Sequence, residues 1–239
     1  MDAELVRVIR DEAIAEVVLN RPDRRNALTE PMMAALRDAF VALSADDSVH
    51  AVVVRGEGGA FCSGLDVREM RQEPPPPWLA RMGQTWREAN VAMADCLKPM
   101  VAALERYAIN GGAPIAFACD HLIAGESASI SITEAKLAMP AAINLAWLQG
   151  KYGEAVALHF TLRAEPVAAA DLLRLGIATQ VVPDDQVLQL ARALARQLAS
   201  YPPVSIQSMK RAVRALNARG LAEPANWFAR AQAIAKLPS

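Results

Sequence analysis

The feature that most constrains the fold of this chain is a buried-strand pattern that passes through small residues into the start of a helix. Ala51–Val54 is an apolar run, which predicts a buried strand. Small residues follow in Ala60–Asp66, and Val67–Met70 is typical of a helix start. Backbone N–H groups at such a turn are free, and the positive end of the helix lies behind them. The turn can therefore hold a developing negative charge, although such joints are usually only structural.

The same pattern occurs a second time in the chain. Met100–Leu104 predicts another buried strand, and Tyr107–Ile109 continues toward Asn110-Gly111-Gly112. Ala113–Cys119 then has a helical pattern. Two turns of this kind can direct their backbone N–H groups at one oxygen atom, which is what an oxyanion hole requires.

The residues at these two turns resemble the enoyl-CoA hydratase/isomerase (crotonase) family. The resemblance runs from about Leu5 to the C-terminal helices, in the order and at the spacing of that family. It implies an α/β fold in which stacked ββα units form a spiral, followed by a C-terminal helical trimerisation region. It is carried by Asn20-Arg21-Pro22, Asn26-Ala27-Leu28, Phe61–Asp66, Asn110-Gly111-Gly112 and Ala118-Cys119-Asp120.

The length and composition predict one domain with a large core, because 53% of the 239 residues are hydrophobic. By resemblance, we expect the spiral core and the thioester site in residues 1–185, and oligomerisation helices in residues 186–239. Leu188–Leu198 and Ile206–Leu216 carry more apolar surface than one small core should absorb. This pattern predicts self-association, and the resemblance implies a homotrimer or a hexamer.

Charge and hydropathy argue against several other classes of protein. The net charge is −1 without a basic block, which is not typical of a nucleic-acid surface. No apolar run approaches the roughly 20 residues that span a bilayer, and no signal-peptide pattern follows Met1, so we expect a cytoplasmic protein. Cys62, Cys96 and Cys119 lack a CxxC spacing, which predicts reduced, buried thiols. No cluster has metal-ligand spacing, so we expect no metal.

The remaining periodicities predict alternating strands and helices. Predicted strands are Leu5–Arg10, Ile14–Leu19, His50–Val54, His121–Ala124, Ser129–Ile132 and Thr179–Val182, and predicted helices are Met32–Leu43, Leu145–Leu162 with a break at Gly150–Gly153, Ala168–Leu175, Asp184–Ser200, Pro203–Arg219 and Leu221–Lys236. Pro74–Pro77 predicts a stiff connector. Five apolar residues after it fit either an acyl pocket or the core: Trp78, Met82, Trp86, Val91 and Met93.

The resemblance also implies a chemistry. Reactions beside a thioester carbonyl push negative charge onto its oxygen, and each hydrogen-bond donor aimed at that oxygen typically contributes about 10²–10³ in rate. By motif position the two donors are the backbone N–H groups of Leu65 and Gly111. CoA is then part of the substrate, and no separate cofactor is implied. A base near the α- or γ-carbon completes such a site.

Hydratases of the family usually carry two glutamates that hold one water molecule. Here the first position is Pro114, which cannot move a proton, and the second matches Glu134. The segment from Glu134 to Pro140 is one residue shorter than usual, and Glu134 could instead cap the following turn. One carboxylate suits isomerisation of a 3-enoyl-CoA to a 2-enoyl-CoA better than hydration, so we expect little hydration. Hydration, decarboxylation of a malonyl-type thioester and a CoA-binding scaffold without catalysis are the alternatives.

Candidate residues for CoA binding lie on two loops that the family brings together. Arg24, Arg25 and Arg68 are candidates for the CoA phosphates, although each is equally well explained as a solvated surface arginine. Asp66 also has a structural explanation as a helix cap, and Asp120 as a tie for a strand end. The complete set of predicted substrate- and CoA-binding residues is Arg24, Arg25, Ala27, Cys62, Gly64, Asp66 and Arg68.

Overall fold

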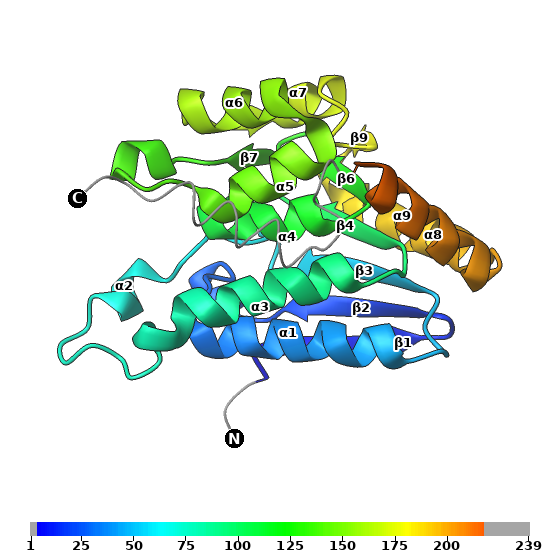
Figure 1. Cartoon of the computed structure of the whole chain (residues 1–239), viewed down its shortest axis with the longest axis horizontal. Helices are drawn as coiled ribbons and strands as arrows, with labels where there is room; N and C mark the ends of the chain where they lie inside the picture. Colours follow the sequence, from blue (N-terminus) through cyan, green and yellow to red (C-terminus); the bar gives the residue numbers. More distant parts are fainter. Residues whose placement is uncertain (1–3, 218–239) are drawn as a thin grey trace.

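The computed structural model describes residues 4–217 and shows a mixed α/β spiral (Figure 1). Its larger sheet has the strand order β1-β2-β3-β4-β6-β9, in which β1 is antiparallel to β2 and every other neighbouring pair is parallel. A second sheet has the order β5-β7-β8. The strands are β1 (Val6–Asp11), β2 (Ile14–Leu19), β3 (Ala51–Gly56), β4 (Met100–Leu104), β5 (Tyr107–Ile109), β6 (His121–Gly125), β7 (Ser129–Ser131), β8 (Val167–Ala168) and β9 (Gln180–Val182).

The helices alternate with these strands, as the ββα pattern predicts. After β4 and β5 comes α4, and after β6 and β7 comes α5, so each unit adds a strand to both sheets. The helices are α1 (Glu30–Ala45), α2 (Val67–Met70), α3 (Met82–Asp95), α4 (Ala113–Ala118), α5 (Ala142–Tyr152), α6 (Glu154–Arg163), α7 (Ala169–Arg174), α8 (Val187–Ala199) and α9 (Pro203–Asn217). The predicted helix Leu221–Lys236 lies outside the described residues.

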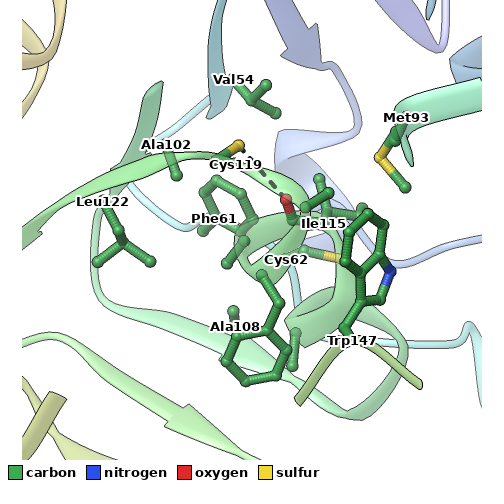
Figure 2. Close-up of a cluster of buried hydrophobic side chains, with 14 of the residues drawn as sticks. Val54, Phe61, Cys62, Met93, Ala102, Ala108, Ile115, Cys119, Leu122 and Trp147 are labelled. Carbon is green, nitrogen blue, oxygen red and sulfur yellow. Dashed lines mark hydrogen bonds between the residues drawn. The ribbon is translucent and has the colours of Figure 1, made fainter. Parts of the chain in front are cut away.

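Both faces of the large sheet are covered, which explains its uninterrupted apolar strands. Val52 and Val54 of β3 face a core that they share with residues of α1, α3 and α4. The alternate residues Ala51 and Val53 point to the opposite face of the sheet, where they pack against the alanines of α8. Figure 2 shows the first core around Phe61 and Trp147. The two faces of β3 are therefore covered by different helices.

The buried face of α8 changes the argument for oligomerisation. Val187, Ala191 and Ala195 of this helix are buried against the chain's own sheet. The four leucines of α8 between residues 188 and 198 are only partly buried against the same core, so part of its apolar surface is absorbed within the chain and part stays accessible. In α9 the side chains of Val204, Met209 and Val213 are exposed, and the oligomer stays a prediction.

Several local predictions are confirmed in the fold. The predicted break in the helix after Leu145 falls at Gly153, whose φ of +83° is comfortable for glycine, and it separates α5 from α6. Trp86 and Met93 belong to the buried core, whereas Trp78 precedes α3. Core packing therefore accounts for Trp86 and Met93. None of the helices described in residues 4–217 is long and apolar enough to cross a membrane.

Candidate active site

The short second sheet brings three separate segments to one place. Cys62 pairs in parallel with Ala108 of β5, and Ala108 pairs in parallel with Ile130 of β7. Leu65 and Gly111 each follow the paired residue of their segment by three positions, and Glu134 follows Ile130 by four. Because the carboxyl ends of parallel strands meet at one edge, all three residues leave the sheet on the same side. Sequence spacing alone did not show this register.

The first turn is held by close backbone contacts. Gly64 has a φ of +89°, and a Cβ atom there would lie 2.8 Å from the carbonyl oxygen of Ile109. Leu28 N–H donates to Gly64 O at 2.7 Å, and Asp66 N–H donates to Leu28 O at 2.9 Å. These bonds fix the peptide groups on both sides of Leu65. The N–H of Leu65 itself donates to no other group within residues 4–217.

The second turn packs directly against the first. A Cβ atom on Gly112 would lie 2.7 Å from Cys62 O, so only glycine permits this approach. A Cβ atom on Gly111 would have the side chains of Leu28 and Leu65 as its nearest neighbours, at 3.5 Å, which is an ordinary contact distance. Among the described residues, nothing accepts a hydrogen bond from the Gly111 N–H. Two unused backbone donors therefore lie on adjoining turns, and α4 begins directly behind the second.

Asn110 connects the second turn to the segment that carries Glu134. Its φ of +46° is a left-handed conformation that asparagine tolerates better than most residues. Its Oδ1 accepts from the Thr133 N–H at 2.7 Å and from the Thr133 hydroxyl at 3.0 Å. Gly111 and Glu134 each follow one member of this pair, so both are held by the same contact.

Glu134 is a buried carboxyl group with an incomplete set of partners. Its side chain is tied to α5, because Asn144 Nδ2 donates to Glu134 Oε1 at 2.9 Å and also to Asn110 O at 3.2 Å. Burial raises the pKa of Glu134, while hydrogen bonds from its own backbone N–H and from Asn144 lower it by less. A raised pKa suits a group that must take up and release a proton. Within residues 4–217 the side chain accepts from Asn144 of α5 and, besides its own N–H, from no backbone group of its turn, which disfavours the capping alternative.

Comparison with known proteins identifies the family. A family model described as enoyl-CoA hydratase/isomerase matches residues 10–237. The chain belongs to the enoyl-CoA hydratase/isomerase family. The resemblance seen in the sequence and the predicted crotonase fold are thereby confirmed.

Relatives of this enoyl-CoA hydratase/isomerase family member cover most of its length. It is 34% identical over 204 residues to the (E)-benzylidenesuccinyl-CoA hydratase of Thauera aromatica, which covers 83% of this chain and 78% of the relative. It is 31% identical over 213 residues to the 2,3-dehydroadipyl-CoA hydratase of Escherichia coli, covering 89% and 82%. The crystal structure of a carnitinyl-CoA hydratase from Mycobacterium avium matches with a TM-score of 0.83 at 29% identity, covering 98% and 91%.

The two loops with the CoA-binding candidates of this family member are clamped together by Arg21. Its guanidinium donates to Ala27 O, lies 3.1 Å from Asp66 Oδ2 and also pairs with Glu69. Ser63 N–H adds a bond to Arg25 O at 3.1 Å. The expected meeting of the two loops is confirmed, and the clamp by Arg21 was not foreseen. The order of charged residues in the sequence does not show which charges of distant segments will pair in the fold.

The predicted binding residues divide into exposed and buried groups. Arg24, Arg25 and Arg68 are exposed on the two clamped loops. Asp66 is buried, and its Oδ1 accepts from Glu69 N–H at 3.1 Å, which confirms it as the cap of α2. Ala27, Cys62 and Gly64 are buried within the loops. Their predicted part in binding CoA stays a prediction.

The cysteines and Asp120 have structural roles. Cys62, Cys96 and Cys119 are free and buried, as predicted. Burial raises the pKa of the Cys62 thiol to about 12, and the thiol donates to Asn26 O at 3.1 Å, so Cys62 is not a thiolate nucleophile. Asp120 Oδ2 accepts from Met100 N–H at 2.8 Å and ties the start of β4. Within residues 4–217, no three His, Cys, Asp or Glu side chains are grouped so as to hold a metal ion.

Asn144 is the polar residue of the site that the sequence did not reveal. It lies in the first turn of α5 within an otherwise apolar stretch, where an asparagine carries no motif. One helical turn further along, Trp147 Nε1 donates to Asn90 Oδ1 at 2.8 Å and anchors α5 to α3. Figure 2 shows Trp147 beside Cys62 and Ile115. The position of Asn144 is therefore fixed by the core beneath the site.

Proposed function

We propose that this chain acts on an enoyl-CoA thioester, with Glu134 as the acid–base group and the N–H groups of Leu65 and Gly111 as oxyanion donors. The main support is a pair of hydrogen bonds from Asn144, one to Glu134 and one to the carbonyl of Asn110, the residue directly before Gly111. This connection holds a proton-transferring carboxyl group beside a turn with free N–H donors. The negative charge that forms on the carbonyl oxygen of the thioester would be stabilised next to the carbon that loses its proton.

The favoured reaction is isomerisation of a 3-enoyl-CoA to a 2-enoyl-CoA. Glu134 takes a proton from C2, the electrons move to the carbonyl oxygen as an enolate, and the same carboxyl group returns a proton at C4. This transfer needs one carboxyl group. It is supported by Pro114, which is buried in the first turn of α4 and can neither hold nor move a proton.

Hydration of a 2-enoyl-CoA is the second candidate. It is supported by the relatives, which are named as hydratases of benzylidenesuccinyl-CoA and dehydroadipyl-CoA. In hydration an enolate of the thioester also forms, but after water adds at C3, so that this enolate carries a 3-hydroxyl group. The two reactions therefore share Leu65, Gly111 and Glu134 and differ in whether a water molecule is held.

CoA itself would lie on the two clamped loops. Arg24, Arg25 and Arg68 are exposed there and carry the positive charge that phosphate groups require. We propose that the carrier of the acyl group is recognised at these arginines and the acyl group at the two turns. In this arrangement CoA is part of the substrate.

The test is a substrate screen with the purified chain. We expect conversion of 3-hexenoyl-CoA to the conjugated 2-hexenoyl-CoA, followed by the ultraviolet absorbance of the conjugated thioester. Hydration of 2-hexenoyl-CoA and decarboxylation of malonyl-CoA are measured in parallel. A chain that binds CoA esters but converts none of them would contradict the proposal and favour the scaffold alternative.

A further inference from the structure

Two of the buried polar atoms that lack a partner lie on neighbouring side chains of the candidate site. Across residues 4–217, four buried side-chain nitrogen or oxygen atoms make no hydrogen bond, and two of these are Glu134 Oε2 and Asn144 Oδ1. Glu134 is 7% exposed and Asn144 is 2% exposed. Leaving such an acceptor unsatisfied is energetically unfavourable. Two orphaned acceptors on neighbouring side chains therefore indicate a site for a donor from outside the part of the chain that the structure describes.

The orientation of the Asn144 amide is determined by its partners. Its Nδ2 donates to Glu134 Oε1 and to Asn110 O, so both N–H bonds are used. A flipped amide would place Oδ1 against a carboxylate oxygen and a carbonyl oxygen, which are both acceptors. The nitrogen therefore faces Glu134 and Asn110, and Oδ1 is left as an acceptor. Each unpaired oxygen therefore lies on one of the two side chains that are joined by the Asn144–Glu134 hydrogen bond.

The chemistry of the missing partner follows from this pair. Both atoms accept, so the partner must offer two hydrogens, and it must be small enough for a site inside the core. Buried water molecules typically make two to four hydrogen bonds to polar groups of this kind. A water molecule that donates to both oxygens keeps its lone pairs free. One of these lone pairs can attack an electrophilic carbon of the substrate.

We propose that Glu134 Oε2 and Asn144 Oδ1 together hold one reactive water molecule, so that an amide takes the place of the second carboxylate that Pro114 lacks. The proposal rests on the proposed function in one respect: Glu134 and the two N–H donors act on an enoyl thioester. It adds a residue and a reactant to that site. The sequence predicts little hydration because it shows only Pro114 and Glu134. The Asn144 oxygen becomes an acceptor of the site only in the fold.

The step balances without a further reactant. The water oxygen forms a bond to C3 of the 2-enoyl thioester, and one of its protons moves to Glu134 Oε2. The electron pair of the C2–C3 double bond moves to the carbonyl oxygen, where the N–H groups of Leu65 and Gly111 stabilise the enolate. C2 then takes the proton from Glu134, and the product is a 3-hydroxyacyl-CoA. Asn144 accepts the second hydrogen of the water and orients it.

The test compares two reactions in the same variants. In Asn144→Leu the water loses an acceptor while Glu134 remains, so hydration of 2-hexenoyl-CoA should fall by about 10²-fold or more, the scale of a general acid–base contribution. Isomerisation of 3-hexenoyl-CoA should also fall, because Glu134 loses the amide that holds it, but by at least about tenfold less than hydration. Asn144→Asp again offers an acceptor to the water, and its protonated form can donate to Glu134 Oε1. Hydration should return to within about tenfold of the wild type, with an altered pH profile.

Three outcomes would overturn the water site. If the wild type isomerises but does not hydrate, the proposed function stands and the water site fails. An equal loss of both reactions in Asn144→Leu would mean that Asn144 only positions Glu134. A folded Asn144→Leu that hydrates normally would place the water elsewhere. If the wild type neither isomerises nor hydrates, the proposed function itself fails. Circular dichroism and binding of hexanoyl-CoA confirm that each variant is folded.

Discussion

Glu16 and Glu134 are both buried glutamates, yet their surroundings are opposite. Glu16 on β2 is 3% exposed and Glu134 is 7% exposed, so burial does not separate them. Arg55 Nε donates to Glu16 Oε2 at 2.8 Å, and Arg192 of α8 pairs with its other oxygen. Glu134 Oε1 accepts from the neutral amide of Asn144, and within residues 4–217 Oε2 has no hydrogen-bond partner. One carboxylate is saturated, and the other has unused bonding capacity.

The difference is also expressed in the two pKa values. Burial raises the pKa of both groups, but in Glu16 the hydrogen bonds and charges of Arg192 and Arg55 outweigh it, and the net pKa is lowered. In Glu134 burial dominates, and the pKa is raised. A buried charge that is fully paired serves the fold, whereas one that lacks partners is available to a substrate. In this chain, partners distinguish a functional carboxyl group better than burial does.

The largest expected effect comes from removing the proton-transferring group. Glu134→Gln keeps the size and one hydrogen-bond acceptor but loses basicity, so isomerisation of 3-hexenoyl-CoA should fall by about 10²–10⁴-fold. Binding of hexanoyl-CoA should survive. Glu16→Gln is the matched control, and its folded fraction should isomerise at the wild-type rate. Equal losses in the two variants would remove the distinction between the two glutamates.

The oxyanion turn provides the next largest effect. Gly111→Pro removes the N–H donor at the start of α4, and turnover should fall by about 10²-fold or more. Gly111→Ala is the control because it keeps the N–H, and its Cβ meets only the side chains of Leu28 and Leu65 at ordinary contact distance. It should lose much less. Unchanged turnover in a folded Gly111→Pro protein would show that this N–H plays no part.

Stability should respond to the two glutamates with opposite signs. Breaking the buried pairs in Glu16→Gln should lower the free energy of unfolding by about 3 kcal/mol at neutral pH. Because the folded pKa of Glu16 is lowered, this contribution exists above the unfolded pKa and is lost as pH falls through the folded pKa. Denaturant unfolding of both proteins between neutral and acidic pH measures the shrinking difference.

Glu134 should instead reduce stability at neutral pH. Its folded pKa is raised, so the group favours the folded state only while protonated, and this advantage is lost as pH rises through the folded pKa. Glu134→Gln should therefore be more stable than the wild type at neutral pH, by about 0.5–2 kcal/mol, as is common where function is exchanged for stability. A destabilised Glu134→Gln protein would mean that Glu134 serves the fold as Glu16 does.

The smallest expected effect is at the loops proposed to hold CoA. Arg68 is exposed, so Arg68→Ala should raise KM for 3-hexenoyl-CoA by only about two- to fivefold with little change in kcat. Arg174→Ala on α7 is the control, since Arg174 is similarly exposed and pairs with Asp171. The effect of Arg68→Ala should disappear with a pantetheine thioester that lacks the phosphates. An effect that persists with that substrate would exclude contact between Arg68 and the phosphates.

Most of the fold and part of the site could be predicted from the sequence. The buried runs around Val53 and Val101 are long and apolar because both faces of the sheet are covered, and such runs are visible in the residues themselves. Asp66 as a cap depends on its neighbours in the chain and was also predictable. The individual side-chain contacts between distant segments were not, because a single sequence carries no record of them. Arg21, with its contacts to Asp66 and Glu69, and Asn144, with its contact to Glu134, belong to this group.

The most direct measurement of the central claim is hydrogen exchange at C2 of a thioester in deuterated water. Hexanoyl-CoA has no double bond, so deuterium can enter at C2 only through the enolate, and mass spectrometry counts it. The wild type and Glu16→Gln should both exchange the C2 hydrogen, whereas Glu134→Gln should exchange it at least about 10²-fold more slowly. Exchange in Glu134→Gln at the wild-type rate would contradict the claim that the incompletely partnered carboxyl group moves the proton.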